Sequence, residues 1–458
     1  MSALLLKEWR ELARDGRAGI ALALLAVTLL FSAWSNHRDA AALVAAERAA
    51  AAAEQARWVG QGEKWFHSAA HYGVWAFRPP GSLPAVDPGI RPYVGTAVWM
   101  EAHWQNEVMH RPAQDATVIE RFGPFSPAIL VGVLAPLVIV LLAFGSVASE
   151  RERGTWTLVL AQGAAPLRVL LAKALVVWLA VAAALVPGLV ALAWSTQRLD
   201  ADLVRFAAWT GLAALHLAMV AAFAVAVSAR AASASRALVF CLCAWVFASV
   251  LWPRLLVGLA SSAEPLPTRA EMRAAYDEFR AAEFARSPRA LQHELMRRHG
   301  VERVEDLPVN WMAIGFQRSE ERGNAFFDRL WGDVFERMRS QQRRVHWGSA
   351  LSPVVAFGTL SKALAGNDLQ HYLAFVAQAE AHRREIQRVL NAGNERRPDV
   401  GGQRHLSGPE LWSRVDAFRF RAPSLGAALA GVWPALLAAL AWSVAALLAL
   451  LAASRRLR

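Results

Sequence analysis

Six long runs of apolar residues alternate with polar segments along the chain. The runs cover residues 18–36, 122–148, 174–195, 206–229, 237–260 and 425–453. A helix needs roughly 20 apolar residues to cross a bilayer, and the runs are of that order. We therefore predict an all-α membrane protein with six transmembrane helices. Because six is an even number, both termini are expected on one side of the membrane.

Two polar segments, 37–121 and 261–424, have the charge content of soluble proteins. Residues 38–57 are strong helix formers and should extend the first helix beyond the membrane. The stretch 66–121 is rich in Gly, Pro, Trp and His, which predicts a compact loop domain with a short helix around 97–109.

The second polar segment carries apolar residues at helical spacing. Charged helices are predicted over 268–286, 289–299, 316–345 and 368–391, and they should stack into a helical domain. Residues 349–366 are weakly apolar and interrupted. This stretch predicts either a surface or re-entrant helix at the membrane or a buried segment of the helical domain.

Residues 1–17 predict an amphipathic helix that lies along the membrane surface before the first span. Leucine and tryptophan side chains fall on one side of it and charged side chains on the rest. Its candidate contact residues are Lys7, Glu8, Trp9 and Arg10.

The short loop 149–173 separates the second and third spans. Its charges crowd into the first turn, at Glu150, Arg151, Glu152 and Arg153. Gly154 and Thr155 then interrupt the chain before an amphipathic stretch, WTLVLAQ. This stretch should lie along the membrane surface, where it suits contact with a soluble partner.

Basic residues decide the orientation. They are concentrated in residues 1–17, in the loop 149–173, around 230–236 and at the C-terminus, whereas the short opposite loop offers only Arg198 and Arg205. Short loops rich in Lys and Arg remain in the cytoplasm. The termini are therefore expected to be cytoplasmic, and the two polar segments to be extracytoplasmic insertions.

The composition fits a membrane protein, with 55% hydrophobic residues and a mean hydropathy of +0.27. The net charge of +12 is spread as Arg over helices that also carry Glu and Asp, so we expect no nucleic-acid partner. Cys241 and Cys243 stand two residues apart in an apolar run and would point to different faces of a helix. A disulfide or a two-cysteine metal site is therefore not expected.

Motifs for catalysis are missing. None of the four lysines belongs to a GxxxxGK[ST] phosphate-binding loop, so if ATP drives this protein, another chain binds it. In HELMRRH, at 293–299, the histidines are six residues apart instead of the four that a zinc protease needs. No GxSxG motif is present either. We expect no catalytic residue and no cofactor in this chain.

Four histidines of the first insertion are candidate metal ligands. His67 and His71 are four residues apart, and His103 and His110 occur together in a later stretch. Imidazole groups can hold copper or zinc. Histidines in such places more often make local hydrogen bonds or cap helices, so the sequence assigns no metal and leaves the four as candidates.

Three motifs carry a family resemblance: KEWRELARDGR at 7–17, AQD at 113–115 with RFGPFSPA at 121–128, and ERERGT at 150–155 with Lys173 entering the next span. They resemble the ABC type-2 transporter permease family, in the branch with two large extracytoplasmic insertions. The resemblance implies that residues 149–160 are a coupling helix that docks onto a separate ATPase. The coupling residues would be Glu150, Arg151, Glu152, Arg153, Gly154 and Thr155.

The same resemblance implies the partners. Two copies of a cytoplasmic ABC ATPase would carry the ATP and Mg²⁺, and a second permease copy, identical or homologous, would complete the membrane unit. The implied location is the lipid bilayer of a bacterial inner membrane, with the insertions in the periplasm. A periplasmic protein is a further candidate partner. The implied function is ATP-driven export or outward transmission of force.

A membrane receptor with an extracytoplasmic ligand-binding domain is the alternative function. It would need a cytoplasmic output domain, and only a few residues follow the last apolar run. A membrane enzyme is a third hypothesis, which the missing catalytic motifs disfavour.

Overall fold

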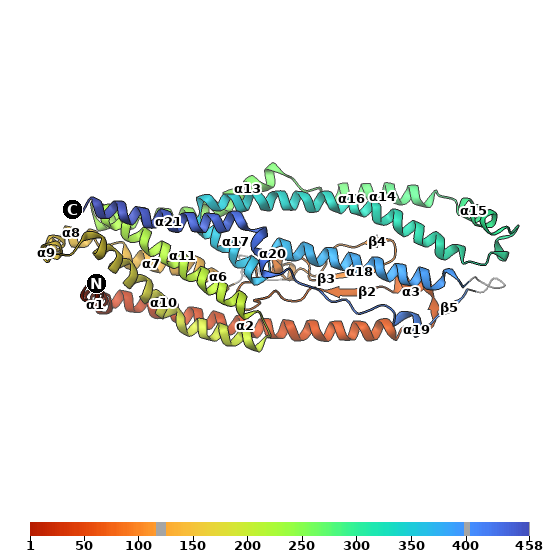
Figure 1. Cartoon of the computed structure of the whole chain (residues 1–458), viewed down its shortest axis with the longest axis horizontal. Coiled ribbons are helices and arrows are strands. Elements are labelled where there is room, and N and C mark those ends of the chain that lie inside the picture. The colour runs from red at the N-terminus through yellow and green to blue at the C-terminus, as the bar shows by residue number, and fades with distance from the viewer. Residues whose placement is uncertain (116–124, 398–403, 458) are drawn as a thin grey trace.

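The structure is a computed structural model that describes residues 1–115, 125–397 and 404–457. The molecule is elongated, and both termini lie at one end (Figure 1). We call this end, which also holds α1 (Ser2–Arg14), α8 (Ala148–Glu152) and α9 (Thr155–Ala161), the terminal end. The structure is 76% helical with few strands, which confirms the prediction of an all-α membrane protein.

The described residues contain six helices that are long and apolar enough to cross a membrane. They are Gly16–Val59 (α2), Pro127–Glu152, Pro166–Arg198 (α10), Leu203–Arg230 (α11), Ala234–Ala263 and Trp433–Arg455 (α21). The second of these helices comprises α6 (Pro127–Ile129), a π-turn at Leu130–Leu134, α7 (Ala135–Ala143) and α8. The fifth helix comprises α12 (Ala234–Val246), a π-turn at Phe247–Leu251 and α13 (Trp252–Ala263).

Each of the six helices extends past its predicted apolar run at one end or both, and two of the runs also begin before the helix does. Residues 122–124 of the second, like residues 116–121 of the first insertion, lie outside the described residues. The prediction that the last span begins at 425 is wrong, because Leu425–Gly431 forms a separate helix, α20. The backbone leaves the helical region at Val432, and α21 then starts with Pro434 in its first turn, a position where proline is well tolerated.

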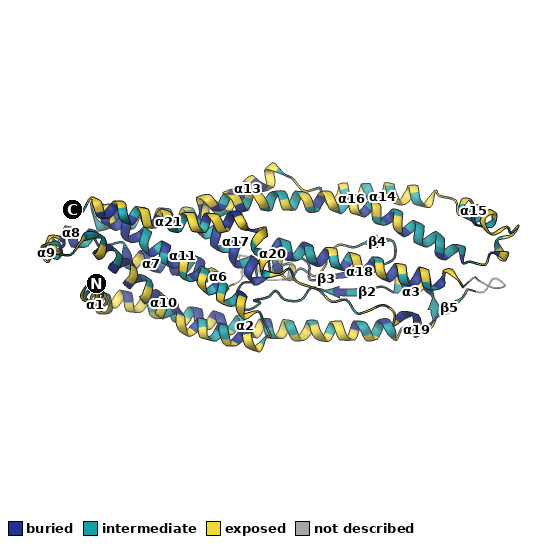
Figure 2. Ribbon diagram, viewed as in Figure 1, coloured by how far each residue is buried: buried dark blue, intermediate teal, exposed yellow. Residues whose placement is uncertain are grey.

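α11 lies at the centre of the six helices and contacts α7, α10 and α21. Figure 2 shows buried residues concentrated where these helices meet. α2 approaches α10 closely, because a Cβ added to Gly188 would lie 2.5 Å from Leu29 Cγ. Trp209 is fully buried on α11 and donates a hydrogen bond to Ser361 Oγ at 2.9 Å.

α2 is one continuous helix of 44 residues. At about 1.5 Å per residue it is about 66 Å long, roughly twice the thickness of the hydrocarbon layer of a bilayer. The predicted helical extension over 38–57 is thus present. Together with residues 64–115, 264–348, 369–397 and 404–421 it forms an elongated part outside the six spans, which we call the distal domain (Figure 1).

The described residues of the distal domain form two small antiparallel sheets. β1 (Lys64–Trp65) pairs with β5 (Leu406–Ser407), and β2 (Val74–Phe77), β3 (Ala97–Glu101) and β4 (Trp104–Gln105) form a three-stranded sheet in that order. The predicted helix around 97–109 is wrong. Val98, Met100 and Ala102 are buried at every second position, the period of a strand, and Trp99 pairs with Trp75 across β2 and β3.

Helices build the rest of the distal domain. The longer ones are α14 (Arg269–Phe284), α15 (Arg289–His299), α16 (Trp311–Gly348) and α18 (Leu369–Glu395). The short ones are α3 (Phe66–Tyr72), α4 (Pro112–Asp115), α19 (Pro409–Trp412) and 3-10 turns at Arg91–Tyr93 and Val304–Asp306, and a further 3-10 turn at Ser349–Leu351 follows α16 outside the distal domain. The sequence-predicted helices of the second insertion correspond to the four longer ones.

Residues 349–366, for which two alternatives were open, form the helix α17 (Pro353–Ala365). Its Phe357, Leu360 and Ala363 are buried, so it is not a surface helix. It packs against α11 and α21. The stretch is therefore buried among the spanning helices, and not within the distal domain.

Candidate functional site

The terminal end gathers three segments that are distant in sequence. α1 contacts α10, and α8 with α9 forms the connection between the second and third spans (Figure 1). Ala165 adopts an extended conformation, and Pro166 then opens α10 at a position where proline is favoured. These elements bring Lys7, Glu150 and Lys173 together.

Two lysines and two glutamates form a closed ion cluster at this junction. Lys173 Nζ lies 3.0 and 2.9 Å from the two carboxylate oxygens of Glu8 and 2.9 Å from Glu150 Oε1. Lys7 Nζ lies 2.6 Å from Glu150 Oε1 and 2.9 Å from Glu8 Oε1. We call Lys7, Glu8, Glu150 and Lys173 the ion cluster.

The ion cluster is largely shielded from water. The Lys173 side chain is 2% exposed, and those of Glu8 and Glu150 are 8% and 7% exposed. Buried charges are tolerated only when they are paired and hydrogen-bonded, as these are. Burial alone would lower the pKa of Lys7, but its hydrogen bonds to Glu150 and Glu8 outweigh that effect and raise the pKa above its ordinary value.

A cation other than lysine is not needed here. Oxygens of Glu8, Glu11 and Glu150 lie within 4.8 Å of one another, which is close enough to hold a metal ion. The ammonium groups of Lys7 and Lys173 already contact these carboxylates and neutralise them. The cluster therefore works as an internal link between three segments.

α8 is also attached to the connection between α11 and α12. Arg151 Nη1 donates hydrogen bonds to the carbonyls of Ala229 and Ala231 at 3.1 and 3.2 Å, at the C-terminal end of α11. A carboxylate oxygen of Glu152 accepts from the backbone N–H of Ala234, at the start of α12. Both contacts match the helix dipole, with a cation at a C-terminus and an anion at an N-terminus.

The outer side of the same segment is exposed. Trp156 is buried and joins the apolar core of the six helices, whereas Arg153, Thr155, Thr157 and Leu158 are exposed. We call these four exposed residues the loop face. Leu158 is 63% exposed, which gives the loop face an apolar centre beside a basic residue.

Gly154 makes the turn between α8 and α9. Its φ of 74° lies in the left-handed region, which glycine adopts without the steric cost that a Cβ brings. A side chain there would meet no neighbouring atom within 4 Å, so the requirement is conformational.

The predicted coupling residues divide into two groups. Arg151, Glu152, Arg153, Gly154 and Thr155 are exposed, so their docking role stays a prediction. Glu150 faces the ion cluster, where it accepts hydrogen bonds from Lys7 and Lys173, and its role in docking likewise stays a prediction. Lys7 and Glu8 likewise point into the cluster, and Trp9 and Arg10 are exposed.

A family model described as ABC-2 family transporter protein matches residues 2–298. The chain belongs to the ABC-2 transporter family. It is thus a multi-pass membrane permease subunit of an ABC transporter, in agreement with the resemblance seen in the sequence, and the receptor alternative is not supported. The matched range includes both α1 and the α8–α9 connection.

A second family model, described as a domain of unknown function (DUF3526), matches residues 269–421 of this ABC-2 permease and overlaps the first match over residues 269–298. That range covers α14 to α19, most of the distal domain. No curated protein matches the sequence.

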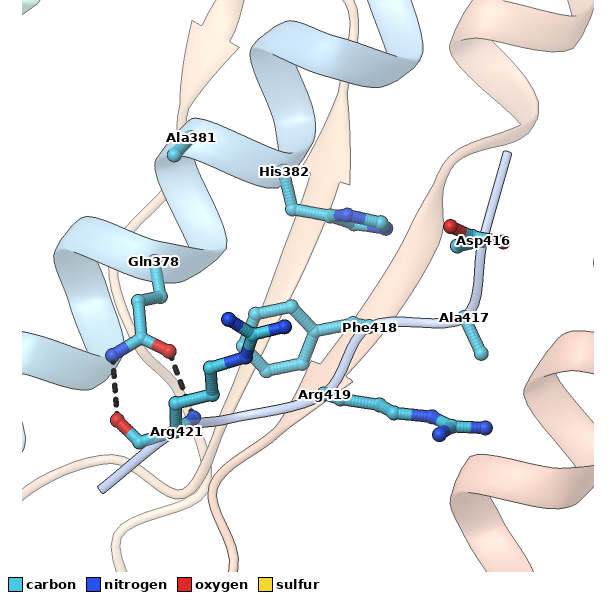
Figure 3. Close-up of a pocket in the computed structure, with 8 residues that line it drawn as sticks. All are labelled: Gln378, Ala381, His382, Asp416, Ala417, Phe418, Arg419 and Arg421. Atoms are coloured by element: carbon cyan, nitrogen blue, oxygen red, sulfur yellow. Dashed lines mark hydrogen bonds between the residues drawn. The ribbon is translucent and has the colours of Figure 1, made fainter. Parts of the chain in front are cut away.

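Two pockets of contrasting character are lined by described residues of the distal domain. One, of about 580 Å³, lies between α18 and the extended segment 416–421 (Figure 3). Gln378 holds that segment by donating to the Arg421 carbonyl and accepting from the Arg421 N–H, both at 2.8 Å. Arg419 and Arg421 point in different directions, so the lining polar groups do not converge on a ligand (Figure 3).

The other pocket, of about 850 Å³, is lined by three of the four candidate histidines, His67, His71 and His103. The fourth, His110, packs against Trp75, with ring centroids 5.6 Å apart, and is not in this group.

Sequence reasoning missed two residues that matter at these sites. Lys173 was recognised only as a residue entering the third span, although two of just four lysines in the chain meet in the ion cluster. Glu320 contacts His103 across 217 residues of sequence, a relationship that no local pattern could indicate.

Proposed function

We propose that this permease couples ATP hydrolysis by a separate cytoplasmic ABC ATPase to export or to outward transmission of force. Two ATPase copies, which carry the ATP and Mg²⁺, dock on the terminal ends of a permease dimer. The terminal end faces the cytoplasm of a bacterial cell, and the distal domain extends from the inner membrane into the periplasm.

The attachment of α8 is the observation that carries this proposal. The ion cluster joins α8 to α1 and α10, and Arg151 and Glu152 join it to α11 and α12. A displacement of the loop face by a docked protein would therefore act on four helices at once. Those contacts are short and mostly charged, which suits a segment that transmits motion without detaching.

Charge supports the orientation. Exposed arginines at the terminal end include Arg10, Arg14, Arg17, Arg153, Arg168, Arg455 and Arg456. Basic residues beside short connections and termini favour the cytoplasmic side.

Exposed apolar faces support a second permease copy. Val239 and Phe240 on α12 and Leu255 and Leu259 on α13 are each at least 56% exposed. In the most apolar stretch of the helix Ala234–Ala263, which comprises α12 and α13, only 11% of the residues are buried. This face meets lipid on part of its surface and the second copy on the rest.

Co-purification tests the docking step. A tagged permease carrying Arg153→Glu and Leu158→Asp should lose the ABC ATPase that co-purifies with the wild type, because both changes alter exposed side chains of the loop face. Arg298→Glu, an exposed change on α15, is the matched control and should retain the ATPase. Equal recovery of the ATPase with the loop-face variant would contradict the proposal, provided that its thermal unfolding is unchanged.

A further inference from the structure

Three histidines from two elements meet at one point of the distal domain. His67 and His71 stand one turn apart on α3, and His103 comes from the turn between β3 and β4. One ring nitrogen from each lies within 4.8 Å of the other two. The ring centroids are 4.7 to 5.3 Å apart.

These separations are close to those of a metal site. Nitrogen atoms bound to Zn²⁺ at about 2.1 Å in a tetrahedral arrangement are about 3.4 Å apart. Small rotations of the imidazole side chains would close the difference. His71 is exposed and His67 and His103 are half-buried, so the rings have room to make such rotations.

His103 is already oriented as a metal ligand. Its Nδ1 lies 2.6 Å from Glu320 Oε1, and its backbone N–H donates to the same oxygen at 2.8 Å. A proton on Nδ1 that is shared with a carboxylate leaves the lone pair of Nε2 free for a metal, the arrangement that commonly supports metal-bound histidine. His103 also has a φ of 66°, so the turn holds the residue in an uncommon conformation.

Glu320 is itself fixed. Its side chain is 4% exposed, and its second oxygen lies 3.2 Å from Nη1 of the buried Arg383. A carboxylate with both oxygens engaged cannot easily rotate away from His103. The order Arg383–Glu320–His103 therefore orients the imidazole toward the other two histidines.

His67 is held by stacking. Its ring lies parallel to that of Phe316, with centroids 3.8 Å apart and an interplanar angle of 3°. This parallel stack fixes the plane of the His67 ring beside the other two imidazoles.

The histidines open on the cavity of about 850 Å³. Aromatic side chains, among them Trp104, Tyr276 and Phe279, line it together with Arg280 and Arg322. Three protein ligands with a fourth position toward a cavity are typical of sites where the metal binds an exchangeable ligand.

We propose that His67, His71 and His103 bind one divalent transition-metal ion, Zn²⁺ or Cu²⁺, through three imidazole nitrogens, with a further coordination position open to the cavity. Imidazole suits both ions. Glu320 is a positioning residue that acts through His103. This site is independent of the ATPase coupling proposed above, because it lies in the distal domain and needs no nucleotide.

Metal content of the full-length protein tests the proposal. The purified permease in detergent is stripped with a chelator, incubated with excess ZnSO₄, desalted and analysed for zinc. We expect one equivalent in the wild type and in the control His110→Ala, and less than a tenth of that in His71→Ala. His71 is exposed, so its replacement should leave the fold intact, as a thermal unfolding curve would check. Absence of zinc from the wild type, or full retention by His71→Ala, would overturn the site.

Copper binding and the Glu320→Gln variant provide two independent tests. Cu²⁺ bound to the wild type should show nitrogen superhyperfine splitting from imidazole in its electron paramagnetic resonance spectrum, and His71→Ala should lose it. Glu320→Gln should weaken zinc affinity by about 10- to 100-fold in competition with a chelator, the usual effect of removing such a carboxylate. A copper spectrum without nitrogen coupling, or unchanged zinc affinity in Glu320→Gln, would count against the geometry.

Discussion

The ammonium group of Lys7 donates a 2.6 Å hydrogen bond to Glu150, and this contact joins the first helix of the chain to the connection between the second and third spans. The two residues are 143 positions apart in sequence. Lys173 reinforces the pair from the third span, because its Nζ lies 2.9 Å from the same oxygen.

Removing Lys173 should therefore destabilise the protein. Lys173→Met leaves the buried carboxylates of Glu8 and Glu150 with one ammonium group between them. Loss of one partner from a buried ion pair costs about 3–5 kcal/mol. We expect a loss of that size in the free energy of unfolding in detergent, and the additional change Glu150→Gln should recover part of it.

Arg456→Met is the matched control for this variant. Arg456 is exposed at the same end of the molecule, and its replacement should leave stability unchanged. If Lys173→Met unfolds like the control, the ion cluster does not hold the three segments together.

The loss of stability on replacing Gly154 should depend on how readily the new residue adopts a positive φ. Gly154→Ala places a Cβ on a residue with a φ of 74°, which costs about 1–2 kcal/mol of folding free energy. Gly154→Asn should cost less, because asparagine visits this region more readily. Thermal unfolding of the two variants against wild type measures the order, and equal stability for alanine and glycine would disprove the conformational argument.

The orientation can be measured by cysteine labelling. In a background of Cys241→Ser and Cys243→Ser, a cysteine replacing the exposed Arg298 on α15 should react with an impermeant maleimide added outside intact spheroplasts. A cysteine replacing the exposed Thr157 of the loop face should react only after lysis. The reverse result would place the terminal end outside the cytoplasm and remove the basis for ATPase docking.

The contact between α14 and α16 should depend on pH. Hydrogen bonds from Arg322 lower the pKa of Glu283 below its ordinary value of 4.5. A lowered pKa in the folded state means that the ionised form stabilises the fold above pH 4.5, and that this contribution is lost as the pH falls below it. Glu283→Gln should lower stability at pH 7 by no more than about 1 kcal/mol, because Arg322 is partly exposed.

Thermal unfolding of wild type and Glu283→Gln between pH 7 and pH 3.5 tests this. The difference in midpoint temperature should shrink as the pH falls. A difference that stays constant across this range would show that the Glu283 carboxylate does not contribute through its charge.

The apolar pattern was sufficient to predict the membrane helices. Runs of about 20 uncharged residues fix where a chain can cross a bilayer, and helix formers after residue 37 correctly indicated that α2 continues beyond it. The same reasoning failed at 97–109, where aromatic and apolar residues next to a Gly- and Pro-rich stretch formed β3 and β4. Cross-strand pairing with β2 decided that conformation, and such pairing is not visible in a local pattern.

The sites were only partly predictable for a similar reason. His67 and His71 were candidates because they are four residues apart in a predicted loop domain, and α3 brings them together. His103 reaches them only because the β3–β4 hairpin turns back beside α3. The charges of the 150–153 turn indicated a contact surface. That Glu150 is turned inward depends on Lys7 and Lys173, which belong to two other helices.

The unbroken course of α2 has a geometric consequence. No turn or loop separates its membrane-spanning half from the half that carries the distal domain. A rigid rod of about 66 Å that tilts by about 10° at its base moves its far end sideways by about 11 Å. The same tilt would move the helix near Leu29, where it packs against Gly188, by only a few ångströms. The tip near Val59 would therefore move farther than the diameter of a small solute while the packing near the base changes little.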